Sequence, residues 1–149
     1  MSKALKEQAL LEDLNDQELA KISKLIQKLK FKKGEYVFKE KEDTKGLYLI
    51  KSGKVEIAKA TSDGWRQPLA VFTTGHFFGE LSILEKRHHQ AFAIASENTE
   101  VFLIGKEDFE RLENEVSPIA FKILKKLALV MCKNLRRMND KFLNALISY

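Results

Sequence analysis

The sequence predicts a mainly β-stranded fold framed by α-helices, and three observations lead to this class. The middle of the chain, from Phe31 to Ile104, holds short runs rich in β-branched and aromatic residues, which favour strands. Glycines fall between or beside these runs, where turns need them. The segments before and after this zone repeat apolar residues every three or four positions, as amphipathic helices do. Many short strands at regular spacing indicate a sandwich or a barrel.

The first zone, residues 1–30, is predicted to form a helical lead. Asn15 followed by Glu18 has the pattern of a capping box, in which each side chain pairs with the other residue's backbone. Apolar residues then recur at intervals of three and four, so we expect the helix to continue to residue 30. The expected apolar face consists of Leu19, Ile22, Leu25, Ile26 and Leu29.

The second zone, residues 31–105, is predicted to hold the strands. Val55 and Ile57 alternate with polar or small neighbours, as in a half-buried strand. Lys59 falls on the apolar phase of the same strand, and we expect it to mark the point where the strand leaves the core. The runs that predict strands are "GEYVFKE", "GLYLIKSGKVEIAKA", "QPLAVFTTGHFF", "QAFAIAS" and "TEVFLIG".

The third zone, residues 106–149, is predicted to return to helix. "KEDFERLENEV" is a short amphipathic segment, and Ser117-Pro118 then supplies an N-cap residue followed by proline at the first helical position. No glycine or further proline follows, so the last helix is about 45 Å long at 1.5 Å per residue. One end of it must project past the barrel or meet a partner. Its heptad-like apolar stripe consists of Leu124, Leu127, Met131, Leu135, Met138, Phe142 and Ala145.

Composition limits the class of protein. The 149 residues favour one domain spanning residues 1–149, and the net charge of +5 neither requires nor excludes an anionic partner. The single cysteine, Cys132, excludes an internal disulfide, fits a reducing cytoplasm and is expected to be a small core residue. The charged N-terminus has no signal-like apolar run, and no stretch is long enough to span a membrane. No nucleophile–base pair stands out, so we expect no enzyme.

The stretch "FFGELS", residues 77–82, is the first candidate for a binding site. Gly79 allows the backbone to turn and approach a ligand with no Cβ in the way. The N–H groups of the residues that follow can point into one concavity and bind phosphate oxygens. The carboxylate of Glu80 would repel a phosphate, but it can accept a hydrogen bond from a ribose 2′-hydroxyl. The stretch can therefore hold a ribose and its phosphate from opposite sides.

Together with the segments around it, this stretch resembles the cyclic nucleotide-binding domain, the sensor module of catabolite activator-like proteins and of cyclic-nucleotide-dependent kinases and channels. The matching segments are "FKKGEYVFKE", "GLYLIKSGKVEI", "GHFFGELSIL", "VFLIGKEDFERL" and "SPIAFKILKKLALVMCKNLRRMND". The resemblance implies a jelly-roll barrel, or double-stranded β-helix, of about eight antiparallel strands. It also implies an N-terminal helix, a phosphate-binding cassette at residues 78–91 and a long C-terminal helix that closes over the base and often dimerises.

The resemblance also assigns roles to residues. In the family, the residue at the position of Glu80 binds the ribose 2′-hydroxyl, and the backbone amides that follow bind the cyclic phosphate. Here these amides are those of Leu81 and Ser82. Arg136 and Asn139 on the last helix are candidate contacts for the base. The ligand implied is a cyclic nucleotide, cAMP in the first place, and no metal or other cofactor is expected. The candidate ligand-binding residues are Phe78, Gly79, Glu80, Leu81, Ser82, Arg87, His89, Gln90 and Ala91.

The sequence departs from the family pattern at one position. The family places an arginine about nine residues after Glu80, where it pairs with the phosphate, and here that position is His89. An arginine carries a permanent charge, whereas a histidine with an ordinary pKa is mostly neutral at pH 7. Three interpretations stay open: a protonated His89 replaces the arginine, Arg87 reaches in from a shifted loop, or the pocket has lost its affinity.

Two hypotheses of different classes follow. In the first, the chain is a cyclic nucleotide sensor in which ligand binding moves the C-terminal helix. In the second, it is a degenerate member of the fold that serves as a dimerisation or protein-interaction module through that helix. The basic residues of the last helix are expected to form its solvated face, and we expect no DNA-binding domain like that of the family's transcription factors. The spacing of His76, His88 and His89 matches no familiar metal ligand set.

Overall fold

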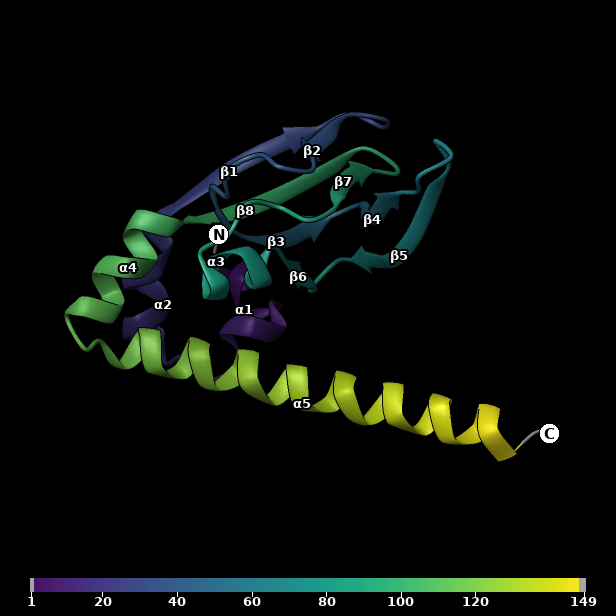
Figure 1. Ribbon diagram of the computed structural model, residues 1–149. Helices are drawn as coiled ribbons and strands as arrows, with labels where there is room; N and C mark the ends of the chain where they lie inside the picture. The colour runs from purple at the N-terminus through teal and green to yellow at the C-terminus, as the bar shows by residue number, and fades with distance from the viewer. Residues whose placement is uncertain (1, 148–149) are drawn as a thin grey trace.

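The fold consists of two facing β-sheets with helices along one side, as predicted. The computed structural model describes residues 2–147, so that Met1, Ser148 and Tyr149, the outermost residues of the predicted domain, lie outside it. Within this range there are eight antiparallel strands in two four-stranded sheets. One sheet has the order β1-β8-β3-β6 and the other β2-β7-β4-β5 (Figure 1). The strands are β1 (Ile26–Phe31), β2 (Tyr36–Phe38), β3 (Gly46–Ser52), β4 (Lys54–Ala60), β5 (Arg66–Thr73), β6 (Phe77–Phe78), β7 (Phe92–Ala95) and β8 (Thr99–Gly105).

Helices precede, interrupt and follow the strands. The N-terminal lead holds α1, a short 3-10 helix and α2, and α3 lies between β6 and β7. No helix within residues 2–147 is long and apolar enough to cross a membrane. The bounds are α1 (Ser2–Lys6), the 3-10 helix (Ala9–Leu11), α2 (Asp16–Ser23), α3 (Glu80–Glu85), α4 (Lys106–Asn114) and α5 (Pro118–Ile147).

The predicted N-terminal helix is only partly right. The capping box at Asn15 and Glu18 is present, and α2 begins directly after Asn15. However, α2 ends at Ser23, and the residues predicted to extend it form β1, which pairs with β8 along its whole length. The spacing of Ile26 and Leu29 fits a helix as well as a strand, and the pairing partner far away in sequence decides between them. The strands therefore begin at Ile26 and not at residue 31.

Strand β3 is buried on both faces and separates two apolar clusters. Leu47 and Leu49 face a cluster formed with the helices, while Tyr48 and Ile50 face a second cluster between the two sheets. This arrangement follows from the alternation of side chains along a strand. Phe78 on β6 belongs to the second cluster and pairs with Tyr48, so the chain enters α3 from a rigid position.

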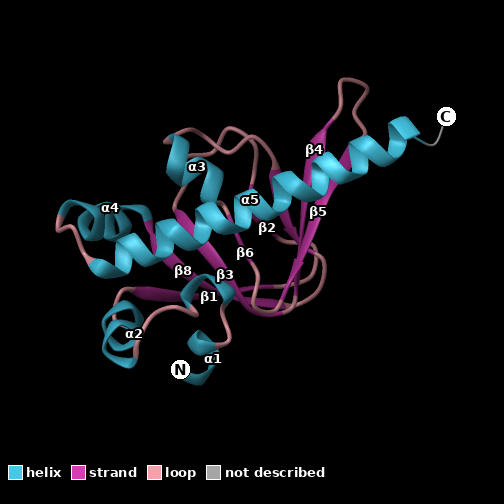
Figure 2. Cartoon of the chain, turned by 90° about the horizontal axis from the view of Figure 1, so that it is seen from below, coloured by secondary structure: helices cyan, strands magenta, loops and turns pink. Residues whose placement is uncertain are grey.

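The long helix α5 has an anchored half and a projecting half. Ser117 caps it as predicted, since its Oγ accepts the N–H of Ile119. One face of its first half is buried as far as Leu127, and Lys126 forms ion pairs with Glu12 and Asp13 of the N-terminal lead. The helix then extends past the strands (Figure 2). Cys132 lies on this second half and is exposed, so its assignment to the core was wrong, because the helix has left the body by that point.

Candidate functional site

The cassette begins where β6 ends, at a sharp turn on Gly79. This residue has a φ of +87°, in the left-handed region that side chains disfavour, and it precedes the first turn of α3. A Cβ at this position would lie 3.2 Å from the carbonyl oxygen of Gly46 and 3.2 Å from the ring of Tyr48. The position therefore requires glycine for its conformation and for its space. The turn leaves the first N–H groups of α3 without partners inside the helix.

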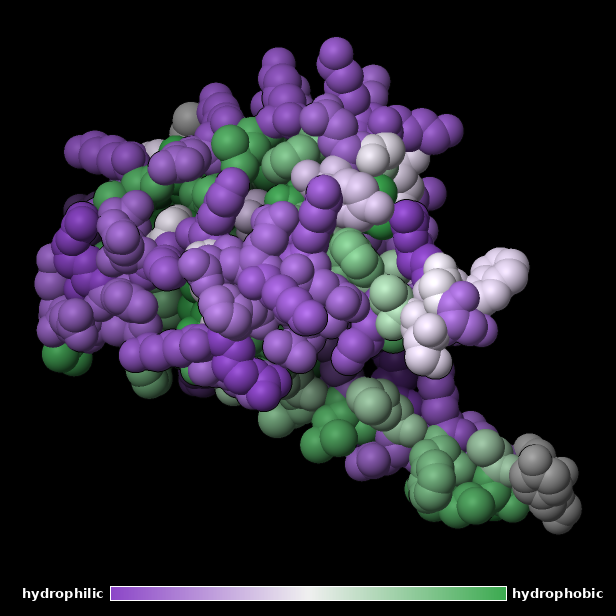
Figure 3. All heavy atoms as spheres, turned by 45° about the horizontal axis from the view of Figure 1, so that its top comes forward, coloured by the Kyte–Doolittle hydropathy of each residue, from purple (hydrophilic) through white to green (hydrophobic). Residues whose placement is uncertain are grey.

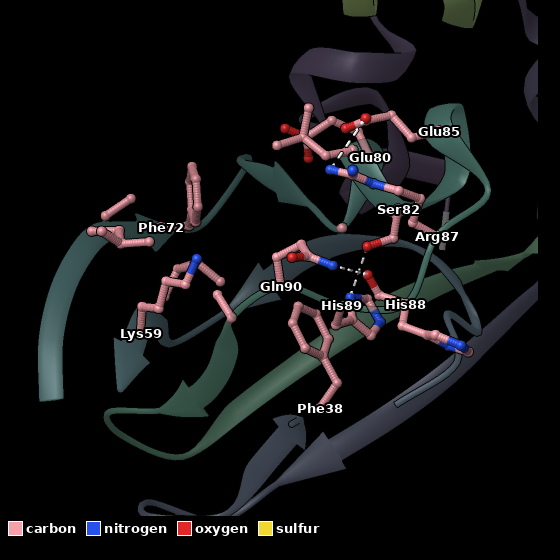
Figure 4. Close-up of a pocket in the computed structure, with 16 residues that line it drawn as sticks. Phe38, Lys59, Phe72, Glu80, Ser82, Glu85, Arg87, His88, His89 and Gln90 are labelled. Atoms are coloured by element: carbon pink, nitrogen blue, oxygen red, sulfur yellow. Dashed lines mark hydrogen bonds and ion pairs between the residues drawn. The ribbon is translucent and has the colours of Figure 1, made fainter. Parts of the chain in front are cut away.

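A cavity of about 510 Å³ lies beside this turn, which we call the cassette cavity. One side is formed by α3 and the loop after it, and the opposite side by β4 and β5 (Figure 4). The volume lies in the range of ordinary small-molecule sites. The predicted binding residues that line the cavity are Gly79, Glu80, Leu81, Ser82, Arg87, His89, Gln90 and Ala91.

Three of the predicted site residues do not line the cassette cavity. Phe78 is a core residue, 2% exposed, because its ring stacks on Tyr48 with centroids 5.0 Å apart. Arg136 and Asn139 lie on the exposed, projecting half of α5.

His89, which occupies the family's arginine position, is buried inside the cassette. It is 2% exposed, and its ring stacks on Phe38 with centroids 3.5 Å apart and planes within 4°. Its Nδ1 lies 3.0 Å from the hydroxyl oxygen of Ser82, while its Nε2 is buried without a hydrogen-bond partner among the described residues. Burial lowers the pKa of His89, and the negative charge of Glu42 opposes this only in part. The ring is therefore neutral at pH 7 while the cavity holds no anion.

The cations near the cassette are distributed differently from what the family pattern implies. Arg87 lines the cassette cavity, and its guanidinium lies 3.3 Å from a carboxylate oxygen of Glu85 on α3. His88 turns away to an ion pair with Asp43, with 2.6 Å between Nδ1 and Oδ1. Because Arg87 is more than half exposed, its pair with Glu85 is weak and open to exchange for a phosphate.

Glu80 lies at the first position of α3, as the family pattern requires. Burial raises the pKa of its carboxyl group, and a hydrogen bond from its own backbone N–H opposes the rise. A donor from a ligand would stabilise the charged form and replace some of the lost hydration. The carboxylate is thus suited to a ribose hydroxyl.

The wall opposite α3 could not be recognised from the sequence. One signal lies at Lys59, which falls on the apolar phase of β4 and is predicted to mark where the strand leaves the core. This expectation is confirmed, since Lys59 is exposed directly after the buried Ala58, and Lys59 also lines the cassette cavity. The other wall residues are apolar and look like ordinary strand residues in the sequence, so nothing distinguished them. They are Phe38, Ile57, Leu69, Ala70 and Phe72.

Comparison with known proteins identifies the family of this chain. Residues 28–115 match the cyclic nucleotide-binding domain family, which is more than half of the chain. The chain therefore belongs to the cyclic nucleotide-binding domain family, and the fold expected from the resemblance is confirmed. The match begins within β1 and ends just after α4, so it includes the whole cassette.

Individual relatives include eukaryotic and bacterial regulators. The cAMP-dependent protein kinase regulatory subunit of Emericella nidulans is 34% identical over 115 residues, covering 77% of this chain and 27% of the relative. The cyclic AMP receptor protein of Thermus thermophilus is 30% identical over 103 residues, covering 69% of this chain and 48% of the relative. The crystal structure of the Thermus thermophilus catabolite activator protein superimposes with a TM-score of 0.76 at 27% identity, covering 90% of this chain and 61% of the other. This chain thus spans less than half the length of these curated relatives.

Proposed function

We propose that this chain is a non-enzymatic sensor domain that binds a purine cyclic nucleotide in the cassette cavity. The observation that carries the proposal is the convergence of Glu80 and the exposed first turn of α3 on one cavity of about 510 Å³. In this proposal Glu80 accepts the ribose 2′-hydroxyl, and the N–H groups of Leu81 and Ser82 donate to the cyclic phosphate. A reducing cytoplasm is its proposed location, which suits the exposed thiol of Cys132.

Arg87 is the proposed cation for the phosphate, in preference to His89. The guanidinium of Arg87 is always charged and lines the cassette cavity, and among the described residues its one ion pair is the exposed pair with Glu85. His89 is neutral in the empty cavity and already contacts Ser82 and Phe38. It would instead orient the hydroxyl of Ser82 next to the phosphate. Of the three interpretations left open by the sequence, these contacts favour the one in which Arg87 reaches in.

The rest of the ligand would lie along the opposite wall. Ile57, Leu69 and Phe72 supply an apolar surface on which a purine base can pack. The names of the two curated relatives make cAMP one candidate ligand, beside cGMP. The wall itself supports a purine of either kind.

Movement of α5 is the proposed output of binding. The cavity is open at its mouth, where Leu69 and Leu81 are 58% and 54% exposed. The first half of α5 is tied to the N-terminal lead by Lys122 with Glu18 and by Lys126 with Glu12 and Asp13. A bound base gives the second half of α5 an apolar surface to cover, and Arg136 and Asn139 then come within reach. Binding would thus shift the helix between two positions.

The proposal is tested by removing the ribose contact. Glu80→Ala is expected to weaken cAMP or cGMP binding about 10- to 100-fold in calorimetric titration, since a hydrogen bond to a charged group contributes about 1.5–3 kcal/mol. Glu97→Ala serves as the control, because Glu97 is an exposed carboxylate outside the cavity. Equal affinity of both variants and the unaltered chain would disprove the site assignment.

A second candidate function is an interaction module that uses α5. The observation that favours it is the apolar surface on the projecting half of this helix, seen as green patches at its far end in Figure 3. We propose a homodimer or a partner protein as the occupant of this surface. It comprises Leu129, Met131, Leu135, Met138, Phe142, Leu143, Leu146 and Ile147, each at least 41% exposed.

The dimer is tested by placing charge on this surface. Sedimentation of the double variant Leu135→Glu/Phe142→Glu is expected to give a monomer, whereas the unaltered chain sediments as a dimer. The control is Lys133→Glu/Lys141→Glu, which changes charged positions of the same helix. Monomeric behaviour of the unaltered chain would remove the homodimer and leave only a different protein as partner.

A further inference from the structure

Lys59 is a cation in the cassette cavity that the proposed contacts do not use. It comes from β4, on the side of the cavity opposite α3 (Figure 4). Within residues 2–147 no carboxylate lies within ion-pair distance of its ammonium group, whereas Arg87 pairs with Glu85 in the same cavity. A charge with no partner on a cavity wall is available to a ligand.

The strand places Lys59 beside the apolar wall. A bulge interrupts the pairing of β4 with β5 between Ile57 and Ala58. Ala58 is fully buried, while Ile57 and Lys59 on either side of it both line the cassette cavity. The extra residue of this bulge is Leu69 on β5, and the ordinary alternation of a strand places Ile57 and Lys59 on one face of β4. Across the strand pair, Lys59 lies opposite Gln67, two residues before Leu69 of the same wall.

The position of Lys59 relative to a ligand follows from the proposed function, on which this inference rests. The phosphate and ribose occupy the α3 side, where Glu80 and the N–H groups of the first turn lie. The base then extends toward Ile57, Leu69 and Phe72, the apolar wall that ends at Lys59. The ammonium group therefore meets the edge of the base and not the phosphate.

An ammonium group distinguishes the two purines by their edges. Lysine has three donors and no acceptor, so it stabilises acceptor atoms only. Guanine presents two neighbouring acceptors, O6 and N7, whereas adenine presents N7 next to an amino group that is itself a donor. We propose that Lys59 is a specificity-determining residue that makes this cavity prefer a cyclic nucleotide with a guanine-type edge over cAMP.

The test uses three ligands whose bases differ in one feature at a time. In calorimetric titration of the full chain, cGMP is expected to bind about 5- to 10-fold more tightly than cAMP. A good side-chain contact to a base edge gives about 1–3 kcal/mol of discrimination, and this factor lies at the lower end of that range. Cyclic IMP keeps O6 and N7 but lacks the 2-amino group, so it is expected to bind like cGMP. If cyclic IMP binds like cAMP, the discrimination comes from the amino group and the role of Lys59 is disproved.

Variants of Lys59 separate base recognition from general charge. Lys59→Met keeps the length of the side chain and is expected to lower cGMP affinity until it equals that for cAMP, while cAMP affinity stays within about twofold. Lys59→Arg is expected to retain the preference. Lys54→Met is the control, since Lys54 lies on the same strand, is exposed and does not line the cavity.

The outcomes distinguish this inference from the proposed function. If Lys59→Met weakens cGMP and cAMP by the same factor, Lys59 acts on the phosphate and the inference is overturned. If the unaltered chain binds both nucleotides with equal affinity, the inference also fails while the proposed function stands. If none of the three nucleotides binds, both fail together.

Discussion

The two ends of the cassette contribute to the cavity in different ways. The first end, Gly79–Ser82, is built mainly from backbone: a glycine turn and the N–H groups at the start of α3, with the carboxylate of Glu80 beside them. The second end, Arg87–Ala91, is built from side chains, and there a buried histidine stacks on Phe38 where the family has a phosphate-binding arginine. In the proposed function Arg87, which lies two residues earlier and pairs with Glu85, supplies the charge for the phosphate.

This difference shows which part of a binding site depends on local geometry and which on the surroundings. The first end keeps its shape because β6 and Gly79 hold it against Tyr48. At the second end, whether a side chain is charged depends on residues far away in sequence, such as Phe38 and Glu42. The following predictions test the two ends separately.

The largest effect is expected from Gly79→Ala, at the first end. The new Cβ would approach the oxygen of Gly46 and the ring of Tyr48 to 3.2 Å, and the residue would keep a positive φ. Strain of this kind costs about 1–3 kcal/mol, and its relief would move the first turn of α3. We expect nucleotide binding to become undetectable by calorimetry and the midpoint of urea unfolding to fall.

Gly64→Ala is the matched control for this change. Gly64 has a nearly equal φ of +85°, but no atom lies within 4 Å of the position that a Cβ would take there, as expected for an open hairpin. The backbone strain is therefore shared by both variants, and the close contact is present only at Gly79. Equal binding by the two variants would show that the tight approach at Gly79 does not shape the site.

An intermediate effect is expected from Arg87→Ala, at the second end. Loss of a charge-assisted contact of about 1.5–3 kcal/mol weakens nucleotide binding about 10- to 100-fold. The carboxylate of Glu85 would also lose its partner and repel the phosphate. Arg66→Ala is the control, because Arg66 is exposed on β5 and does not line the cavity. Unchanged affinity in Arg87→Ala would return the role of phosphate cation to His89.

The smallest effect is expected from His89→Gln, and it concerns stability. Burial lowers the pKa of His89 in the folded state, while the unfolded chain keeps an ordinary value of about 6.5. Between these two values only the unfolded chain binds the proton, so the free energy of unfolding rises with pH and levels off above about 6.5. Urea unfolding of the unaltered chain should therefore show lower stability at pH 5.5 than at pH 7.5.

His89→Gln should reduce this difference, because the variant has no proton to gain at this position. His88→Gln, which removes the exposed neighbouring histidine, is the control and should keep the difference of the unaltered chain. If the unaltered chain is instead more stable at pH 5.5 and His89→Gln abolishes that gain, His89 is charged in the folded state.

The fold was largely predictable because its signals are local. The glycine turns, the runs of strand residues and the caps at Asn15 and Ser117 each act over a few residues, and the structure confirms them. The errors at β1 and Cys132 have another origin. Strand β1 depends on β8 as a pairing partner, and the exposure of Cys132 depends on where α5 leaves the body.

The site was predictable along one contiguous segment only. The residues of the cassette follow one another in the sequence, so a single motif located most of them. Phe38, Ile57 and Phe72 join the cavity from other strands, and only the folded chain brings them to the cassette. The neutral state of His89 was equally hidden, because the stacking ring of Phe38 comes from a distant part of the chain.

The most direct test of the central claim is calorimetric titration of the unaltered chain with cGMP and cAMP at pH 6 and pH 8. Arg87 keeps its charge over this range, so we predict binding whose affinity changes by less than about twofold between the two pH values. Affinity at least about tenfold weaker at pH 8 would mean that a protonated histidine holds the phosphate. No binding of either nucleotide at either pH would mean that the cassette cavity does not bind cyclic nucleotides and would disprove the proposed function.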